Sequence, residues 1–158
     1  MNTQLKLPPV VKSIVVARSA EDAFQLYTRD IGKWWPTGTH SLGQAQVADV
    51  QMEPGAGGRI FERWRDGTEK LWGTISVWEK AQRLVHSWHV STDPDHASEV
   101  EVRFAALGPN RTRVTLEHRH WERMSGEKAQ TTRDSYDSGW NGVFIEQFGN
   151  FAGKVSDA

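Results

Sequence analysis

Residues 131–152 read TTRDSYDSGWNGVFIEQFGNFA. Large aromatic side chains recur in this stretch at intervals of four, four and three residues: Trp140, Phe144, Phe148 and Phe151. Such spacing places them on one side of an α-helix. A helix with a broad aromatic side must bury it, and the face of a β-sheet is the simplest partner that is wide enough. The sequence therefore predicts a long C-terminal helix that packs on a sheet.

Composition excludes several classes of protein. A net charge of −1 without a basic cluster argues against a nucleic-acid-binding surface. No apolar run approaches the ~20 residues that span a bilayer, and the N-terminus has no signal-peptide pattern. The chain has no cysteine, which excludes disulfides and cysteine-ligated zinc. We expect one cytoplasmic domain over residues 1–158, with its core at about residues 10–154.

Strand and turn signals alternate before the helix. Residues 10–17 are apolar and β-branched, which is typical of a strand. Ser19 followed by Asp22 marks the start of a helix, and a second short helix is expected within residues 30–36. Further strands are expected at residues 46–52, 59–64, 70–78, 84–90, 99–105 and 113–120. Consecutive strands joined by short turns are antiparallel, so this order predicts an α+β domain.

Four segments carry a family resemblance: WWPTGTHS at 34–41, GGRIFERWRDGTEKLWGTISVWEKAQRLVHSW at 57–88, EVEVRFAALGPNRTRVTLEHRHWERM at 99–124 and GWNGVFIEQFGNFA at 139–152. In order and spacing they resemble the SRPBCC or START-like superfamily, and within it the AHSA1-like family, named for activators of the Hsp90 ATPase. The resemblance implies the helix-grip fold. In that fold a curved antiparallel sheet of about six to seven strands surrounds a long C-terminal helix, with one or two short helices after the first strand. It also implies an internal cavity between sheet and helix.

The family name suggests work with a chaperone. The eukaryotic activators pair this domain with an N-terminal domain that carries an NxNNWHW segment. These 158 residues contain no such segment. The sequence therefore disfavours Hsp90 activation, because a shared fold alone does not transfer a function.

Two histidines are candidates for the interior. Alternation along residues 113–120 places His118, and His120 after it, on the same face as the apolar Leu116. The same rule places His86 beside Trp88. Each ring can bond a ligand, or it can be a core histidine that backbone or water satisfies, and we favour the second role. His118 and His120 could chelate a metal, but no third ligand stands at a diagnostic spacing, so we expect no metal.

One acidic residue is a further candidate. Glu62 shares a strand face with Ile60 and Trp64, so burial of that face would demand a partner or a shifted pKa. It could form a general acid–base pair with His118. The favoured alternative is a structural ion pair with an arginine: Arg59, Arg63 or Arg103.

Eight tryptophans are many for this length and favour a hydrophobic or aromatic ligand. Which strand faces of residues 59–64 and 70–78 line the cavity stays open. The predicted ligand-binding residues are Trp34, Trp35, His40, Trp72, His86, Trp88, His118, Trp121, Trp140 and Phe144.

Three functions follow from these patterns. The favoured one is binding of a hydrophobic small molecule, without catalysis and without a cofactor. The second is a cofactor-free cyclase, dehydratase or hydrolase that uses His118, His86 or Glu62 as acid or base. The third is a protein-binding module such as a chaperone partner, which would need a large exposed apolar patch. A homodimer is compatible with a fold of this size.

Overall fold

The computed structural model describes residues 7–90, 92–124 and 128–156. In this part of the chain eight strands form one antiparallel sheet, in the order β2-β3-β4-β5-β6-β7-β1-β8. The strands are β1 (Val10–Val16), β2 (Val47–Met52), β3 (Arg59–Trp64), β4 (Glu69–Glu79), β5 (Arg83–Trp88), β6 (Ser98–Gly108), β7 (Arg111–Arg119) and β8 (Lys154–Val155). The count slightly exceeds the predicted six to seven because a two-residue strand, β8, joins the edge of β1.

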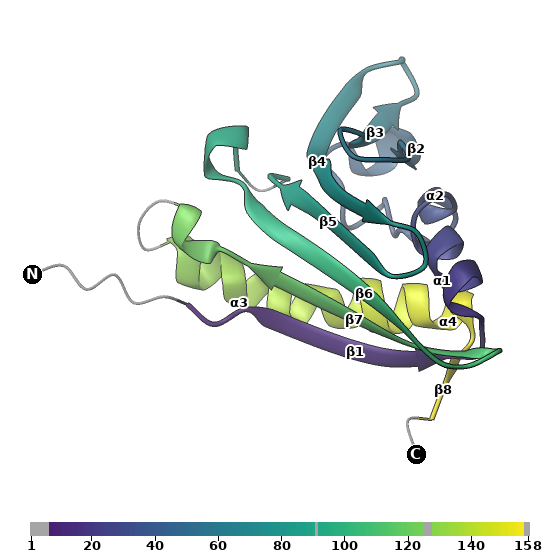
Figure 1. The fold of residues 1–158 in the computed structure, drawn as a ribbon. Helices are drawn as coiled ribbons and strands as arrows, with labels where there is room; N and C mark the ends of the chain where they lie inside the picture. The colour runs from purple at the N-terminus through teal and green to yellow at the C-terminus, as the bar shows by residue number, and fades with distance from the viewer. Residues whose placement is uncertain (1–6, 91, 125–127, 157–158) are drawn as a thin grey trace, which may run out of the picture.

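The helices follow the predicted order. They are α1 (Ala20–Tyr27), α2 (Ile31–Trp34), α3 (Lys128–Trp140), the π-helical segment η4 (Asn141–Phe148) and α4 (Gly149–Ala152), with short 3-10 turns η1 (Gln44–Gln46), η2 (Pro94–His96) and η3 (Trp121–Arg123). Ser19 caps α1 as predicted, because its hydroxyl accepts the backbone N–H of Asp22 at 3.1 Å. Segments α3, η4 and α4 form one long rod across the concave side of the sheet (Figure 1). This is the predicted helix-grip fold.

The aromatic stripe of the C-terminal helix is buried. Trp140, Phe144 and Phe148 are at most 2% exposed, and Phe151 is partly buried. An α-helix has 3.6 residues per turn, so steps of four residues drift round its axis. The wider turns of η4 reduce that drift, which keeps the stripe pointed at the sheet. Phe148 packs against Tyr27 and Trp34, with ring centroids 5.2 and 5.0 Å apart, so α1 and α2 close one end of the core.

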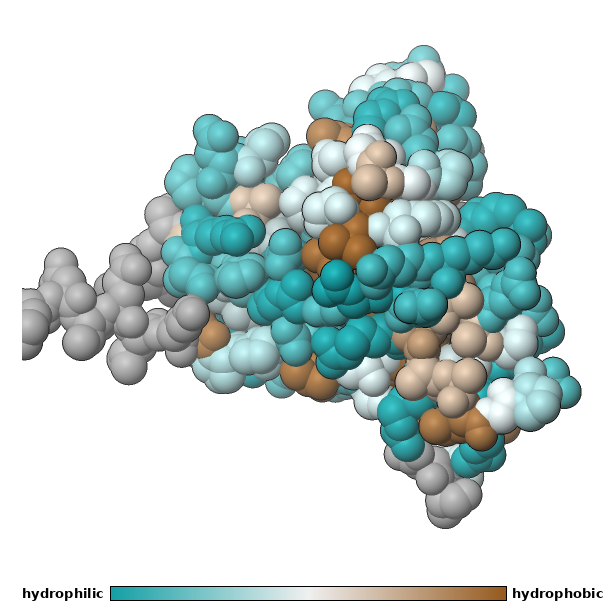
Figure 2. Space-filling view, in the orientation of Figure 1, coloured by the Kyte–Doolittle hydropathy of each residue, from teal (hydrophilic) through white to brown (hydrophobic). Residues whose placement is uncertain are grey.

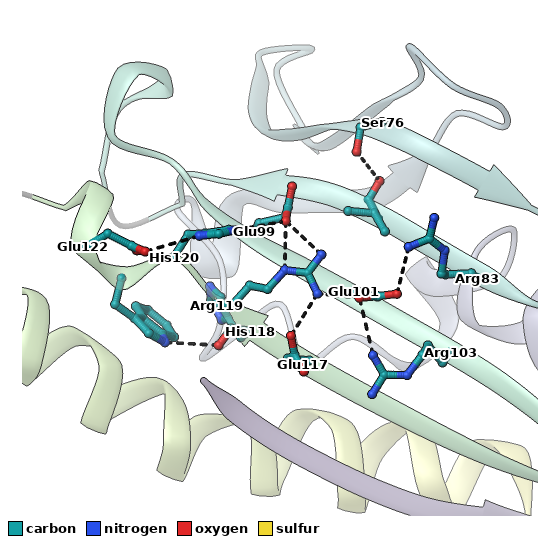
Figure 3. Close-up of polar contacts among 12 residues, drawn as sticks. Ser76, Arg83, Glu99, Glu101, Arg103, Glu117, His118, Arg119, His120 and Glu122 are labelled. Atoms are coloured by element: carbon teal, nitrogen blue, oxygen red, sulfur yellow. Dashed lines mark hydrogen bonds and ion pairs between the residues drawn. The ribbon is translucent and has the colours of Figure 1, made fainter. Parts of the chain in front are cut away.

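The convex face of the sheet carries charges. Arg119 donates to the carboxylates of Glu99 and Glu117 at 2.9 Å each, and also to Glu101 (Figure 3). Arg83 donates to the other oxygen of Glu101 at 3.2 Å. This network lies on the polar face that the alternation over residues 99–105 predicts, with Glu101 itself buried beneath the arginines, and it leaves the concave face to the apolar core and the site. No helix among the described residues is long and apolar enough to cross a membrane.

Candidate functional site

A small pocket lies between the C-terminal helix and the end of β5. Its volume is about 160 Å³. We call it the helix–sheet pocket, and we call residues 36–43, which cover one side of it, the mouth loop. The lining residues are Trp35, Thr39, His40, Ser41, Trp88, Val90, Tyr136, Gly139, Trp140 and Val143. Sheet, helix and loop all contribute, so the pocket exists only in the folded chain.

Three indoles form the walls of the pocket. The ring centroids of Trp35, Trp88 and Trp140 are 5.7–5.9 Å apart in each pair. The N–H of Trp35 donates to the carbonyl of His40 at 2.6 Å, and that of Trp88 to the hydroxyl of Tyr136 at 2.9 Å. The N–H of Trp140 also bonds within the protein. The indoles therefore present their ring carbons and π faces to a ligand, and their N–H groups are not directed at it as hydrogen-bond donors.

His118 is a buried histidine with both ring nitrogens engaged. Its Nδ1 accepts the indole N–H of Trp140 at 3.0 Å, so the ring proton must lie on Nε2. Nε2 donates to Ser98 Oγ at 2.7 Å, and Ser98 Oγ donates to the carbonyl of Trp88 at 3.2 Å. Burial, with a smaller effect of nearby His86, holds the pKa of His118 well below its usual value. The ring is neutral and structural, and it fixes the orientation of a pocket wall.

His86 also faces inward. Val100 pairs with His86 on one side and with His118 on the other, so the histidines lie in one row across β5, β6 and β7. The Nδ1 of His86 donates to the carbonyl of Ser87 at 2.9 Å, and burial lowers the pKa of His86 to about 4. The ring is therefore neutral at pH 7, and it is not among the residues that line the pocket.

His120 departs from the expected inward alternation. Strand β7 ends at Arg119, and His120 turns the chain with a φ of 69°. Its ring nitrogens lie 3.5 Å from a carboxylate oxygen of Glu99 and 3.3 Å from one of Glu122. His120 and His118 therefore do not form a chelating pair. Within the described residues, no group of three histidine or acidic side chains is arranged to hold a metal ion.

Glu62 is fully buried and has neither of the expected partners. Its Oε1 accepts the backbone N–H of Leu42 and the indole N–H of Trp72, and its Oε2 accepts the N–H of Gly43 and the indole N–H of Trp64, all at 2.7 Å. The favoured prediction of an ion pair with an arginine is therefore wrong, and the less favoured alternative, a pair with His118, is not formed either. Four neutral donors stabilise the carboxylate instead, and two of them belong to the end of the mouth loop.

Gly43 is required by this arrangement. A Cβ at this position would lie 2.4 Å from the indole nitrogen of Trp64. The glycine therefore lets the loop reach the carboxylate of Glu62, beside the indole that shares it. Through this contact β3 and β4 hold the mouth loop in place over the pocket.

His40 lies at the mouth of the pocket. Its ring is exposed to solvent, and its Nδ1 lies 2.7 Å from Thr39 Oγ1. A Cβ on Gly139 of α3 would lie 4.0 Å from its Nε2, so this nitrogen lies close to the helix at the edge of the pocket. His40 therefore supplies the pocket lining with an imidazole that a ligand can contact.

The structure brings only some of the predicted binding residues to the pocket. Trp35, His40, Trp88 and Trp140 line it. The others are buried in the surrounding core: Trp34, Trp72, His86, His118, Trp121 and Phe144. Sequence reasoning missed Tyr136, although it stands four residues before Trp140 on the same helix face. The loop residues Thr39 and Ser41 had no periodic signal.

A wider groove of about 680 Å³ lies between the first helices and strands β2 and β4. Its lining includes the apolar Phe24, Met52 and Trp78 and the charged Arg29, Asp30, Lys33, Asp49 and Lys80. Asp30 pairs with Arg29 and Lys33, and Lys80 pairs with Glu21. The carboxylate of Asp49 accepts the N–H of Val50 and the side-chain amide of Gln51, so the charged groups of the groove are engaged with neighbouring protein groups. The smaller helix–sheet pocket is the better candidate.

The comparisons with known proteins agree with this fold. The family described as activator of Hsp90 ATPase homolog 1-like protein matches residues 17–152. A solved anthrahydroquino-γ-pyrone synthase, Txn09, is 35% identical; the match covers 92% of this chain and 97% of that one, with a TM-score of 0.64. CalC, a self-sacrificing resistance protein from Micromonospora echinospora, is 28% identical over 92% of this chain and 94% of that one, with a TM-score of 0.66.

An Hsp90 activator from Plasmodium falciparum has the same fold at 17% identity. The match covers 94% of this chain and 99% of that one, with a TM-score of 0.62. Identity at this level shows the fold alone. No curated protein matches the sequence.

Proposed function

The chain belongs to the activator of Hsp90 ATPase homolog 1-like family, and on that premise we propose that it binds a flat hydrophobic or aromatic small molecule in the helix–sheet pocket. The observation that carries the proposal is the wall of three indoles around an open volume of about 160 Å³. Flat aromatic faces attract a flat aromatic ligand by dispersion and by ring–ring electrostatics.

The size of the pocket constrains how the ligand lies. A dry engineered cavity of roughly 150 Å³ holds one benzene ring, whereas pockets for drug-sized ligands span about 300–1,000 Å³. The helix–sheet pocket, at about 160 Å³, therefore holds one ring of a larger ligand. The rest would extend past the mouth loop, where Thr39, His40 and Ser41 supply polar groups.

A second candidate is a cofactor-free enzyme that closes a ring. The 35% identity to a solved γ-pyrone synthase over nearly the whole chain favours it. The sequence-based acid–base candidates support it poorly. Both ring nitrogens of His118 and both carboxylate oxygens of Glu62 are hydrogen-bonded to other groups of the protein, and His86 is outside the pocket lining. An enzyme of this kind would need its acid or base at the mouth.

A chaperone-partner role has less support. Among the described residues, the exposed large hydrophobic side chains lie on five separate segments: Val11, Leu42, Leu71, Leu107 and Val155. Figure 2 shows a hydrophilic band that crosses one face and separates its hydrophobic areas. A protein-docking site would gather such side chains into one patch. The homodimer stays a prediction.

Tryptophan fluorescence tests the binding proposal, because three tryptophans line the pocket. We expect 1-naphthol and 2′-hydroxychalcone to quench the emission of the wild type in a saturable way. Val90→Phe places a ring in the pocket and should abolish quenching. Val77→Phe is the matched control, because Val77 is also partly buried on the sheet but does not line the pocket. If neither probe binds the wild type, or if Val90→Phe binds as well as Val77→Phe, the proposal is wrong.

A further inference from the structure

We infer that His40 exchanges a proton with the ligand bound in the helix–sheet pocket, so that this pocket is a catalytic site. The inference rests on the proposed ligand site and goes beyond it, from binding to a reaction.

Most polar side chains of the pocket are engaged within the protein. The three indole N–H groups donate to protein acceptors. The hydroxyl of Ser41 donates to the carbonyl of Thr37 at 2.5 Å and accepts the N–H of Gln44 at 2.8 Å. Among the described residues, no partner bonds the Nε2 of His40, although its Nδ1 is bonded. Nε2 is therefore the nitrogen that a ligand can meet.

Thr39 sets the orientation of the imidazole. Its Oγ1 lies 2.7 Å from His40 Nδ1 and 3.4 Å from the carbonyl of Pro36. A hydroxyl has one proton, and the Pro36 carbonyl can only accept. When that proton points to Pro36, Nδ1–H of His40 donates to Oγ1, and Nε2 carries the lone pair. A base whose second nitrogen is held by a third group is the usual arrangement of a proton-transferring histidine.

The protein also fixes the backbone that carries this pair. The indole of Trp35 holds the carbonyl of His40 at 2.6 Å, and Glu62 holds the N–H groups of Leu42 and Gly43 at 2.7 Å. His40 thus lies at a set place beside the opening, with Nε2 directed to Gly139. A ligand whose ring occupies the pocket and whose remainder leaves through the mouth must pass this nitrogen. Contact with solvent allows the ring to exchange its proton with water.

The chemistry open to such a group is proton transfer without oxidation or reduction. The 35% identity to a solved γ-pyrone synthase favours one substrate class, an aromatic compound whose hydroxyl can close a ring on a conjugated carbon–carbon double bond. Nε2 takes the hydroxyl proton while the oxygen forms a bond to the β-carbon and the π bond of the alkene breaks. The imidazolium then returns the proton to the α-carbon. The product is an isomer of the substrate, and no further reactant is consumed.

The isomerisation of 2′-hydroxychalcone to flavanone tests this step, because it is the same ring closure and changes the absorption spectrum. We expect the wild type to accelerate it above the rate in buffer. His40→Ala should lower the accelerated rate by about 100-fold, or to the rate in buffer, because general acid–base catalysis contributes at least that factor. His96→Ala is the matched control: its ring is partly exposed, and its Nδ1 bonds Asp93 at 2.8 Å, but it is not in the pocket lining.

Variants of Thr39 test its positioning role. Thr39→Val keeps the shape but removes the hydroxyl, and should lower the rate and change its pH profile, because Nδ1 loses its partner. Thr39→Ser should restore both. A purely structural role of Thr39 would leave the pH profile unchanged.

Each outcome decides the inference. If the probe quenches the wild-type fluorescence but the isomerisation runs at the rate in buffer, or if His40→Ala keeps the wild-type rate, the inference is wrong and the binding function stands. If the probe does not bind, the proposed function fails with it. Catalysis that is lost in His40→Ala and kept in His96→Ala supports the inference.

Discussion

Replacing Glu62 by glutamine tests the contact that holds the mouth loop. The substitution keeps the shape of the side chain but exchanges one carboxylate oxygen for an NH₂ group. In the wild type each oxygen accepts two N–H groups, one from the mouth loop and one from an indole, and the indole of Trp72 is fully buried. In the variant two of these donors would face a donor.

The expected loss follows from those two contacts. A buried donor left without an acceptor costs roughly 1–3 kcal/mol, and hydrogen bonds to a charged acceptor are the stronger kind. In either orientation of the amide one of the two donors belongs to the mouth loop, where water can replace the acceptor, so we expect a loss of roughly 1–3 kcal/mol, a sizeable part of the ~5–15 kcal/mol of a typical domain. The loss should be accompanied by faster hydrogen exchange at the amides of Leu42 and Gly43, because these lose the fixed acceptor.

Urea denaturation of the variant and the wild type measures the free energy of unfolding. Glu69→Gln is the matched control on the same hairpin, because Glu69 bonds only the exposed Arg59 and Arg63 among the described residues. Its loss should be much smaller, since solvent screens surface ion pairs. A loss below about 1 kcal/mol in Glu62→Gln, or unchanged exchange in the mouth loop, would refute the reasoning.

Two further predictions concern the buried histidines. Trp140→Phe removes the N–H that His118 accepts and should cost about 1–3 kcal/mol in denaturant melts, whereas Trp140→Ala also empties the core and should cost about 3–5 kcal/mol; an unchanged stability of Trp140→Phe would show that the hydrogen bond is irrelevant. Burial lowers the pKa of His86 to about 4 and also lowers that of His118. Below about pH 6.5 these histidines become protonated in the unfolded chain but stay neutral in the folded chain. The free energy of unfolding should therefore fall toward pH 4 by up to ~1.4 kcal/mol per pH unit for each histidine. His86→Gln should flatten this slope in a denaturation series from pH 7 to 4.5, and a flat wild-type series would contradict the assignment.

Local patterns predicted the elements of this fold and the faces that they bury. The four-residue spacing of Trp140, Phe144 and Phe148 placed them on one side of a helix, and alternation placed His118 inward beside Leu116. Both predictions are confirmed by burial. They could be made because the periods of helix and strand are properties of a few neighbouring residues. Alternation failed at His120, because the strand ends one residue earlier, at Arg119, and His120 has a left-handed backbone conformation.

The partners of buried polar groups could not be predicted in this way. Glu62 bonds the mouth loop about twenty residues before it and an indole ten residues after it, and His118 bonds an indole on the C-terminal helix. The pocket itself collects Trp35, Tyr136 and Trp88 from three distant segments. The sequence by itself determined which side chains turn inward, because that depends on the local backbone period. Only the tertiary structure decided which atoms they meet and what space is left between them, because hydrogen bonds and cavities depend on distances between segments that strand register and loop packing set.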